Sequence, residues 1–346
     1  MPSVTLGRTN LTVEKNGFGA LPIQRVSMAE AARLLVKAYD HGIRFFDTAR
    51  AYSDSEEKMG YALSGMRKDI IIATKTHAQS GAELREHLDT SLRLLKTDCI
   101  DIYQLHNPAF CPKPGGEDGL YDAAVQMKAQ GKIRFIGITN HRHHVAQEAI
   151  QSGLYDTLQF PFNYLASARE RELVLSCGAA NMGFIAMKAL SGGLITRPDA
   201  AYAFLADYQQ VLPIWGVQRE KELDDFIGFI KDPPRMTDQL QAVIERDRRE
   251  LVDNFCRGCG YCLPCPAGIE IPQAARMSLL IRRAPSEAFL SRQWQEKMSR
   301  IDECIHCDHC KTHCPYNLDT PRLLAENLKD YRELVEGKST EDPWNL

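Results

Sequence analysis

The sequence lacks several features that would place it in particular classes of protein. Its 42 basic and 45 acidic side chains leave a net charge of −3, so no excess of positive charge would attract nucleic acid or an anionic membrane. The longest apolar run, residues 183–196, is interrupted by Lys188 and is too short to span a bilayer. Residues 1–11 contain no apolar segment typical of a secretory signal. We therefore expect a soluble, cytoplasmic protein with no nucleic-acid or membrane partner.

Strand-like and helix-like segments alternate through the first two thirds of the chain, after a β-hairpin expected over residues 4–13. Amphipathic patterns such as 28–39 and 83–95 predict the helices. Strict alternation indicates a parallel sheet, and eight repeats over about 215 residues favour a closed (β/α)8 TIM barrel. An open, doubly wound sheet is the competing interpretation, but no Gly-x-Gly-x-x-Gly follows the first strand. The predicted strands cover residues 17–23, 43–48, 70–76, 100–107, 133–140, 157–164, 184–190 and 211–217.

The composition changes after Asp232. The pair Pro233-Pro234 ends the last barrel helix, because proline cannot continue a helix. A charged amphipathic helix is predicted over residues 237–254, and a cysteine-rich segment follows it. We therefore expect two domains, a barrel over residues 1–232 and a small, mainly α-helical domain over residues 233–346.

Polar residues suited to proton transfer follow three of the predicted strands. The second strand leads to Asp47 and then Tyr52, the third reaches Lys75, and the fourth reaches His106. In a parallel barrel the active site lies at these carboxyl ends. Tyr52 can protonate a carbonyl oxygen as hydride reaches the carbon, and a charged Lys75 would lower the pKa of that phenol. Asp47 would keep Lys75 charged, and His106 would polarise the carbonyl. A purely structural ion pair between Asp47 and Lys75 is the alternative.

These motifs resemble the aldo-keto reductase superfamily, and the resemblance extends from Val4 to about Asp232. It implies reduction of a small-molecule carbonyl, or oxidation of an alcohol, with NAD(P)H. It also supports the assignment of the four polar residues as a catalytic tetrad. The matching segments are Asp47-Thr48-Ala49 with Tyr52 and Glu56-Glu57, then Ala73 to Thr76, Tyr103 to Asn107, Gly137 to Asn140 and Leu158 to Tyr164.

The same resemblance implies where the nicotinamide cofactor binds. Thr139, Asn140 and Gln159 would hold the nicotinamide amide. The phosphates would lie over the loops after the seventh and eighth strands, and Arg219 would favour the 2′-phosphate of NADP(H). The remaining contacts implied are Met187, Lys188, Ser191, Gly193, Gly216, Gln218 and Asp225.

Two positions depart from the family pattern. Met187 and Lys188 stand where an aromatic ring usually stacks on the nicotinamide, and Phe226 stands where an asparagine usually contacts adenine. Both changes predict weaker nicotinamide binding. The first would also leave space and a nearby cation for a flavin.

Eight of the eleven cysteines form two motifs, Cys256-x2-Cys259-x2-Cys262-x2-Cys265 and Cys304-x2-Cys307-x2-Cys310-x3-Cys314, each followed by proline. Disulfides would be unusual in a cytoplasmic chain, and the spacing of the cysteines indicates that they bind metal. The motifs resemble a ferredoxin module with two [4Fe-4S] clusters, although the first has x2 where x3 is usual. Structural zinc is the alternative. The resemblance implies one cluster on Cys256, Cys259, Cys262 and Cys314, and the other on Cys265, Cys304, Cys307 and Cys310.

The two halves predict an iron–sulfur oxidoreductase of the aldo-keto reductase type, with clusters for electron transfer. A hydride carries two electrons together, whereas each cluster takes one at a time. A bound flavin, or a ferredoxin or flavoprotein partner, would connect the two. The alternative is that the clusters are structural, or serve only an external ferredoxin-like partner. The alternative from a different class is an electron-transfer protein whose barrel docks a flavin or a redox partner and no longer reduces carbonyls.

Overall fold

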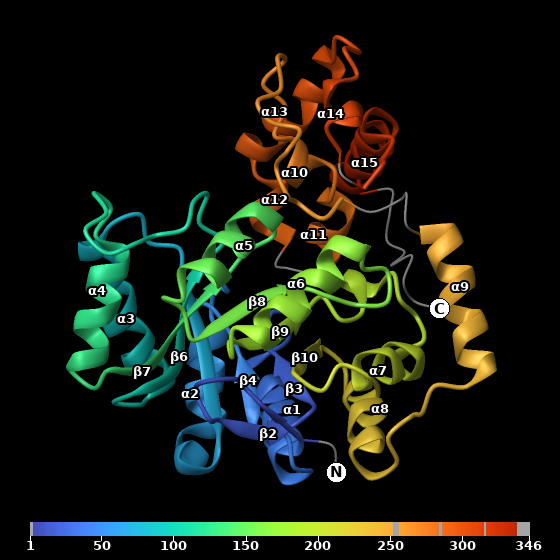
Figure 1. Ribbon diagram of the computed structural model, residues 1–346. Helices are drawn as coiled ribbons and strands as arrows, with labels where there is room; N and C mark the ends of the chain where they lie inside the picture. Colours follow the sequence, from blue (N-terminus) through green and yellow to red (C-terminus); the bar gives the residue numbers. More distant parts are fainter. Residues whose placement is uncertain (1–2, 252–255, 284–285, 315, 338–346) are drawn as a thin grey trace. The chain divides into compact units, whose positions relative to one another are not determined.

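The computed structural model describes residues 3–251, 256–283, 286–314 and 316–337. Two compact units divide the chain (Figure 1): Met1–Ser191 with Ile195–Gln241, called the barrel unit here, and Gly192–Leu194 with Ala242–Leu346, called the cysteine unit. The division falls within helix α9 (Asp238–Leu251), beyond the boundary near Pro233 that the sequence suggests. Across the described ranges, no helix is both long and apolar enough to cross a membrane.

The barrel unit contains a closed barrel of parallel strands in the order β10-β3-β4-β5-β6-β7-β8-β9. Closure excludes the open, doubly wound sheet and confirms the predicted (β/α)8 barrel, because every strand pairs with two parallel neighbours. The strands are β3 (Gly17–Gly19), β4 (Phe45–Asp47), β5 (Ile71–Thr76), β6 (Ile100–His106), β7 (Ile133–Thr139), β8 (Thr157–Pro161), β9 (Gly183–Met187) and β10 (Val211–Gly216).

A helix follows each barrel strand and lies outside the barrel in Figure 1. Local sequence explains several of the starting points: Ser27 and Glu30 form a reciprocal capping box at the start of α1, and Ser167 and Glu170 do the same for α6. The helices are α1 (Met28–Asp40), α2 (Ser55–Leu63), α3 (Gly81–Leu95), α4 (Leu120–Ala129), α5 (His143–Ser152), α6 (Ala168–Ala179), α7 (Pro198–Ala206) and α8 (Glu220–Lys231).

The first barrel strand is shorter than the predicted 17–23. It ends at Gly19, and the 3-10 helix η1 (Pro22–Arg25) replaces its second half. Pro22 has no backbone N–H to donate to a neighbouring strand and suits the first turn of a helix. The loop leading to α1 therefore begins earlier than the apolar pattern suggests.

The predicted hairpin forms from β1 (Ser3–Thr5) and β2 (Thr12–Glu14). Its apolar side chains share a core cluster with residues near the amino ends of the barrel strands, such as Phe45, Ile102 and Leu212. Burying each aliphatic side chain stabilises the fold by about 1.5–3 kcal/mol. The hairpin therefore closes the amino end of the barrel, which leaves the carboxyl ends of the strands for a site.

The cysteine unit is mainly helical, as predicted. The helix expected over residues 237–254 begins at Asp238, and its residues 252–254 lie outside the described part of the chain, as does Pro315 after the last cysteine. Ile271, Met277, Leu324 and Tyr331 form its core together with cluster-motif cysteines. Its other helices are α10 (Ile271–Ala274), α11 (Met277–Arg283), α12 (Ser286–Leu290), α13 (Arg292–Ser299), η4 (Arg300–Glu303), α14 (His309–Thr312) and α15 (Thr320–Val335).

Candidate functional site

A buried ion pair lies at the carboxyl ends of β4 and β5. Lys75 Nζ donates to Asp47 Oδ2 at 2.6 Å and to the carbonyl oxygen of Thr48 at 2.5 Å. The two charged side chains are 1% and 3% exposed. Burial alone would lower the pKa of Lys75, but the neighbouring Asp47 carboxylate and the Tyr52 side chain outweigh it and hold that pKa above its usual value. Lys75 is therefore charged at neutral pH.

Tyr52 and His106 complete the predicted tetrad. Tyr52 lies in the loop between β4 and α2, and Lys75 Nζ is 5.0 Å from the centroid of its ring. The rings of Tyr52 and His106 meet edge to face, with centroids 5.9 Å apart and an interplanar angle of 83°. The structure thus brings all four residues together at one end of the barrel.

The protonation states of Tyr52 and His106 differ from those of free side chains. Burial raises the pKa of the Tyr52 phenol, and the charge of Lys75 opposes this shift without reversing it. Lys75 therefore lowers that pKa as predicted, but burial, which the prediction left out, has the larger effect and sets the net direction. Burial, Lys75 and His77 lower the pKa of His106 to about 3, which makes it neutral. Its buried Nδ1 has no hydrogen-bond partner among the residues that the structure describes.

Two glutamines from the barrel interior surround Asp47. Gln104 Nε2 donates to Asp47 Oδ1 and Gln159 Nε2 donates to Oδ2, each at 3.4 Å. Both Oε1 atoms are buried and have no partner within the described ranges. Gln104 is absent from the predicted site, although its place two residues before His106 puts both on one face of β6. A Cβ on Gly137 would lie 2.8 Å from Gln104 Cγ, so glycine leaves the space that Gln104 fills.

A second buried network holds the Tyr52 loop against β5. The fully buried carboxylate of Glu56 pairs with Arg50 and accepts a hydrogen bond from Thr74 Oγ1 at 2.7 Å. Thr74 directly precedes Lys75, whereas Arg50 and Glu56 flank Tyr52 in sequence. The network therefore fixes the phenol-bearing loop relative to the lysine.

The three residues expected to hold the nicotinamide amide differ in how many of their hydrogen-bonding groups are already used within the protein. Asn140 Nδ2 donates to the carbonyl oxygen of Pro108, and its Oδ1 accepts from the backbone of His141 and Arg142. That amide therefore uses its oxygen and one N–H within its own loop and keeps one N–H to donate. Thr139 Oγ1 accepts from the backbone N–H of Asn107 and keeps its hydroxyl hydrogen to donate. Gln159 Oε1, which is buried without a hydrogen-bond partner among the described residues, could accept a hydrogen bond from a carboxamide.

The loops expected to lie under the phosphates have left-handed backbone. Met187 ends β9, and Lys188 follows with φ +56° while its carbonyl oxygen accepts from Asn163 Nδ2 at 2.9 Å. The 3-10 turn η3 (Ser191–Gly193) has φ values of +53°, +74° and +106°. Glycine takes such values without strain, so the sequence suits the turn at Gly192 and Gly193, whereas Ser191 adopts the left-handed region without that freedom.

At the loop after β10, the groups expected to contact phosphate are bound to a side chain of this chain. The backbone N–H groups of Gln218 and Arg219 donate to Glu222 Oε2 at 2.8 and 3.0 Å, and the Arg219 guanidinium donates to Oε1 at 3.0 Å. Gly216 ends β10 and Asp225 lies exposed on α8. Arg219 is therefore directed to Glu222 in this structure.

The second departure from the family pattern is a core residue. Phe226 is 2% exposed, and its ring stacks on Trp215 with centroids 4.4 Å apart and an interplanar angle of 16°. A ring packed in this way is not available to an adenine. The change from asparagine to phenylalanine therefore adds to the barrel core.

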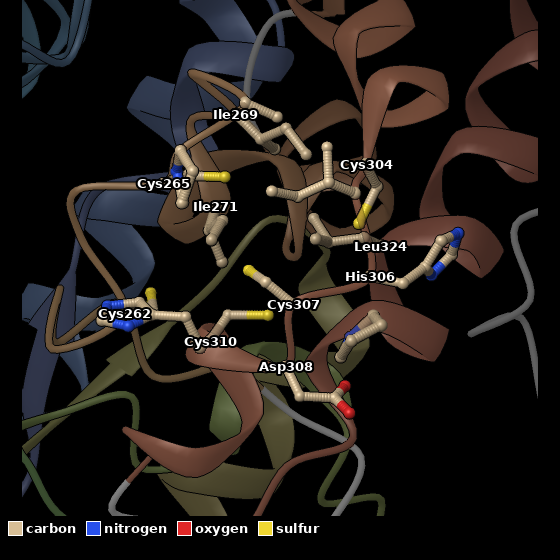
Figure 2. A pocket seen from close by; sticks show the side chains of 15 residues that line it. Cys262, Cys265, Ile269, Ile271, Cys304, His306, Cys307, Asp308, Cys310 and Leu324 are labelled. Carbon is tan, nitrogen blue, oxygen red and sulfur yellow. The ribbon is translucent and has the colours of Figure 1, made fainter.

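The cysteine unit contains two apolar cavities lined by the cysteine motifs. One is lined by five cysteines, which are Cys256, Cys259, Cys262, Cys310 and Cys314. The other is lined by Cys262, Cys265, Cys304, Cys307 and Cys310. In Figure 2 the last four of these side chains direct sulfur toward a shared space. Each cavity thus contains the four cysteines expected to share a cluster, including one from the other motif, while Cys262 and Cys310 line both cavities. This arrangement supports the implied exchange of ligands.

The cysteines fit a cluster better than a single ion. All eight are free thiols, and apolar side chains such as Ile269, Ile271 and Leu324 form the other walls. Within the described residues, no three His, Cys, Asp or Glu side chains are arranged to hold one metal ion. Thiols spread around a cavity suit a four-iron cubane, whereas tetrahedral zinc needs them close together.

Comparison with known proteins agrees with both units. The aldo/keto reductase family model matches residues 15–200, and a 4Fe-4S dicluster domain model matches residues 255–319. The uncharacterized oxidoreductase YrpG of Bacillus subtilis is 28% identical over 323 residues, which cover 78% of this chain and 98% of YrpG. YqkF of the same organism is 29% identical over 206 residues, covering 56% of this chain and 66% of YqkF, just under two thirds.

Solved structures share the fold of the barrel unit. An aldo-keto reductase from Klebsiella pneumoniae, in complex with NADPH, has a TM-score of 0.61 at 21% identity, covering 70% of this chain and 94% of its own. A putative aldo-keto reductase from Pseudomonas aeruginosa has a TM-score of 0.58 at 26% identity, covering 65% and 92%. Neither matching family description names a flavin.

Proposed function

This chain is an oxidoreductase of the aldo/keto reductase family, and we propose that it reduces a small carbonyl compound with NADPH and exchanges electrons through two [4Fe-4S] clusters. The convergence of Asp47, Tyr52, Lys75 and His106 at the carboxyl end of the barrel carries the proposal. A structural ion pair alone would need neither the phenol nor the neutral imidazole beside it. The reverse reaction, oxidation of an alcohol, uses the same groups.

When bound, the nicotinamide supplies hydride to the carbonyl carbon. Negative charge then develops on the carbonyl oxygen, and His106 donates an N–H hydrogen bond to it. Because the pKa of His106 is about 3, the imidazole is neutral and polarises the carbonyl without competing as an acid. One such donor contributes about 10²–10³-fold in kcat in other enzymes.

Tyr52 transfers its phenolic proton to the same oxygen. The raised pKa keeps the phenol protonated before the reaction. The charge of Lys75, fixed by Asp47 and the Thr48 carbonyl, then stabilises the phenolate that the transfer leaves behind. This stabilisation is preorganised, because the ammonium is in place before charge develops.

A preference for NADP(H) follows from the hydrogen-bonding groups of Gln159 and Arg219. The open oxygen of Gln159 would accept a hydrogen bond from the nicotinamide amide. Arg219 would reach a 2′-phosphate after leaving Glu222, which favours NADP(H) over NAD(H). The NADPH bound by the Klebsiella pneumoniae relative makes NADPH the first cofactor to test.

The test is NADPH oxidation by anaerobically purified protein with a panel of small aldehydes and ketones. We expect Tyr52→Phe to lower kcat by about 10²–10⁴-fold. Its dissociation constant for NADPH should stay unchanged, because the lost contact exists mainly in the transition state. Tyr61→Phe, which alters a 59% exposed tyrosine on α2, is the control. Near wild-type turnover of Tyr52→Phe would contradict the assignment of Tyr52 as the proton donor.

A second candidate is an electron-transfer protein that no longer reduces carbonyls. Two observations favour it: Asn140 uses its amide within its own loop, and Arg219 pairs with Glu222. Both reduce the number of groups that the barrel can use to bind a nicotinamide cofactor. Calorimetric titration with NADPH separates the two candidates. Absence of binding, together with clusters that a reduced ferredoxin can reduce, would support electron transfer alone.

A further inference from the structure

A guanidinium lies against the first cysteine motif. Arg276 lies between α10 and α11, and its Nε donates to the carbonyl oxygen of Pro272 at 2.7 Å. A Cβ placed on Gly258 would lie 2.9 Å from Arg276 Cζ and 3.1 Å from both of its terminal nitrogens. Gly258, between Cys256 and Cys259, therefore leaves the space in which the guanidinium rests on the loop.

The charge of Arg276 acts on the cysteines of this loop. Burial lowers the pKa of Arg276, and the neighbouring Cys256 and Cys259 oppose that shift. Arginine nevertheless stays protonated in proteins, so the charge is permanent. A second arginine, Arg257, is 8% exposed and lines the cavity that contains Cys256, Cys259 and Cys314; it stacks on Tyr316 with its Cζ 4.1 Å from the ring centroid.

The other cavity has a different electrostatic environment. Its described lining residues include Asp308 and two histidines but neither arginine nor lysine. The guanidinium of Arg300 approaches Gly268, which follows the last cysteine of the first motif, but Arg300 is exposed. Solvent and salt screen an exposed charge far more than a partly buried one. The cavity that contains Cys256, Cys259 and Cys314 therefore has more buried positive charge near it than the other cavity.

We propose that Arg276 raises the reduction potential of the cluster held by Cys256, Cys259 and Cys262, so that the two clusters differ in potential and an electron entering the domain comes to rest there. The inference rests on the clusters of the proposed function. Reduction adds one electron to a cluster and its four thiolates, forms and breaks no bond, and makes the assembly more negative by one charge. A fixed cation stabilises that reduced state more than the oxidised one, and local charge is among the determinants of cluster potential.

The experiment is an anaerobic redox titration of the full-length holoprotein with dithionite, monitored by electron paramagnetic resonance. Iron and acid-labile sulfide are counted first, to establish that each variant carries both clusters. We expect Arg276→Gln to lower one potential by a tenfold change in its reduction equilibrium or more, which is 59 mV for one electron. The second potential should move less. Arg276→Lys, which keeps the charge, should recover most of the difference.

Arg322→Gln is the matched control, because it removes a 59% exposed arginine from α15 of the same unit. It should shift neither potential. Equal shifts of both potentials in Arg276→Gln, or no shift, would overturn the inference. Loss of a cluster from Arg276→Gln would assign Arg276 a structural role and would also overturn it.

The titration contains neither nicotinamide nor carbonyl compound, so its outcome is independent of catalysis by the tetrad. A holoprotein with both clusters and an unmoved potential would count against Arg276 alone. A wild-type protein with no iron and no sulfide would instead refute the clusters of the proposed function, and this inference with them.

Discussion

Replacing Lys75 with methionine separates the stabilising role of the buried pair from its chemical role. At 2.6 Å and an effective dielectric constant of about 20, Asp47 and Lys75 attract each other by about 6 kcal/mol before desolvation is subtracted. Desolvation costs several kcal/mol per ion, so the intact pair adds little net stability. Removing the lysine alone leaves Asp47 with the two 3.4 Å amide contacts of Gln104 and Gln159. We expect Lys75→Met to destabilise the protein by about 3–5 kcal/mol.

The loss should depend on pH with a defined sign. Burial raises the pKa of Asp47, and in the variant Lys75 no longer opposes this shift. A carboxyl whose folded pKa exceeds its unfolded value, about 3.9, contributes stability at low pH that is lost as pH rises. The deficit of Lys75→Met relative to wild type should therefore increase as the pH rises from about 3.9 toward neutrality. In the wild type, the raised pKa of Lys75 keeps its contribution present throughout this range.

The assay is urea unfolding followed by far-ultraviolet circular dichroism, with all variants prepared anaerobically. Asp47→Asn/Lys75→Met leaves no unpaired charge, so it should regain much of the lost stability while carbonyl reduction stays abolished. Lys132→Met removes an exposed pair with the same 2.6 Å separation and should change stability little. A pH-independent deficit in Lys75→Met, or a double variant no more stable than the single one, would refute the reasoning.

Three further predictions concern the surroundings of the tetrad. Because the pKa of His106 is about 3, kcat should show no histidine inflection between pH 5 and 8; a step near pH 6.5 that His106→Gln removes would contradict this. Glu222→Gln should release the Arg219 guanidinium from its ion pair and lower KM for NADPH more than KM for NADH. An equal change in both KM values would contradict a contact between Arg219 and the 2′-phosphate. Phe226→Ala should destabilise the protein by about 3–5 kcal/mol in urea unfolding through loss of the stack on Trp215. Unchanged stability with altered NADPH affinity would place that ring at the cofactor instead.

The barrel and the positions of the tetrad could be predicted because both depend on local order along the chain. Eight apolar runs alternate with helical patterns, and Asp47, Lys75 and His106 each lie at the end of a barrel strand or one residue before it. Once the strands are parallel, their ends must meet at one edge. The length of β3 could not be read from apolar pattern alone, because Pro22 interrupts a run that hydrophobicity would continue.

The electrostatics of the site could not be predicted, because they depend on how deeply each group is buried. The sequence gives the sign of the effect of Lys75 on Tyr52 but not the larger effect of burial, which reverses the net shift. Gln104 was missed for a related reason: its role depends on space that Gly137 leaves on the next strand. The pairing of Arg219 with Glu222, in contrast, follows from a separation of three residues at a helix start and was available in the sequence.

The exchange of cysteine ligands between motifs can be tested by counting iron. Cys265 follows three cysteines of the first motif in sequence but lines the cavity of Cys304 and Cys307. If these residues bind the same cluster, Cys265→Ala/Cys304→Ala should lose one cluster and retain about four irons. Cys256→Ala/Cys265→Ala should lose both, because its two changes fall in different cavities. Four irons retained in the second variant and none in the first would show that each motif binds its own cluster, and that the two cavities do not define the ligand sets.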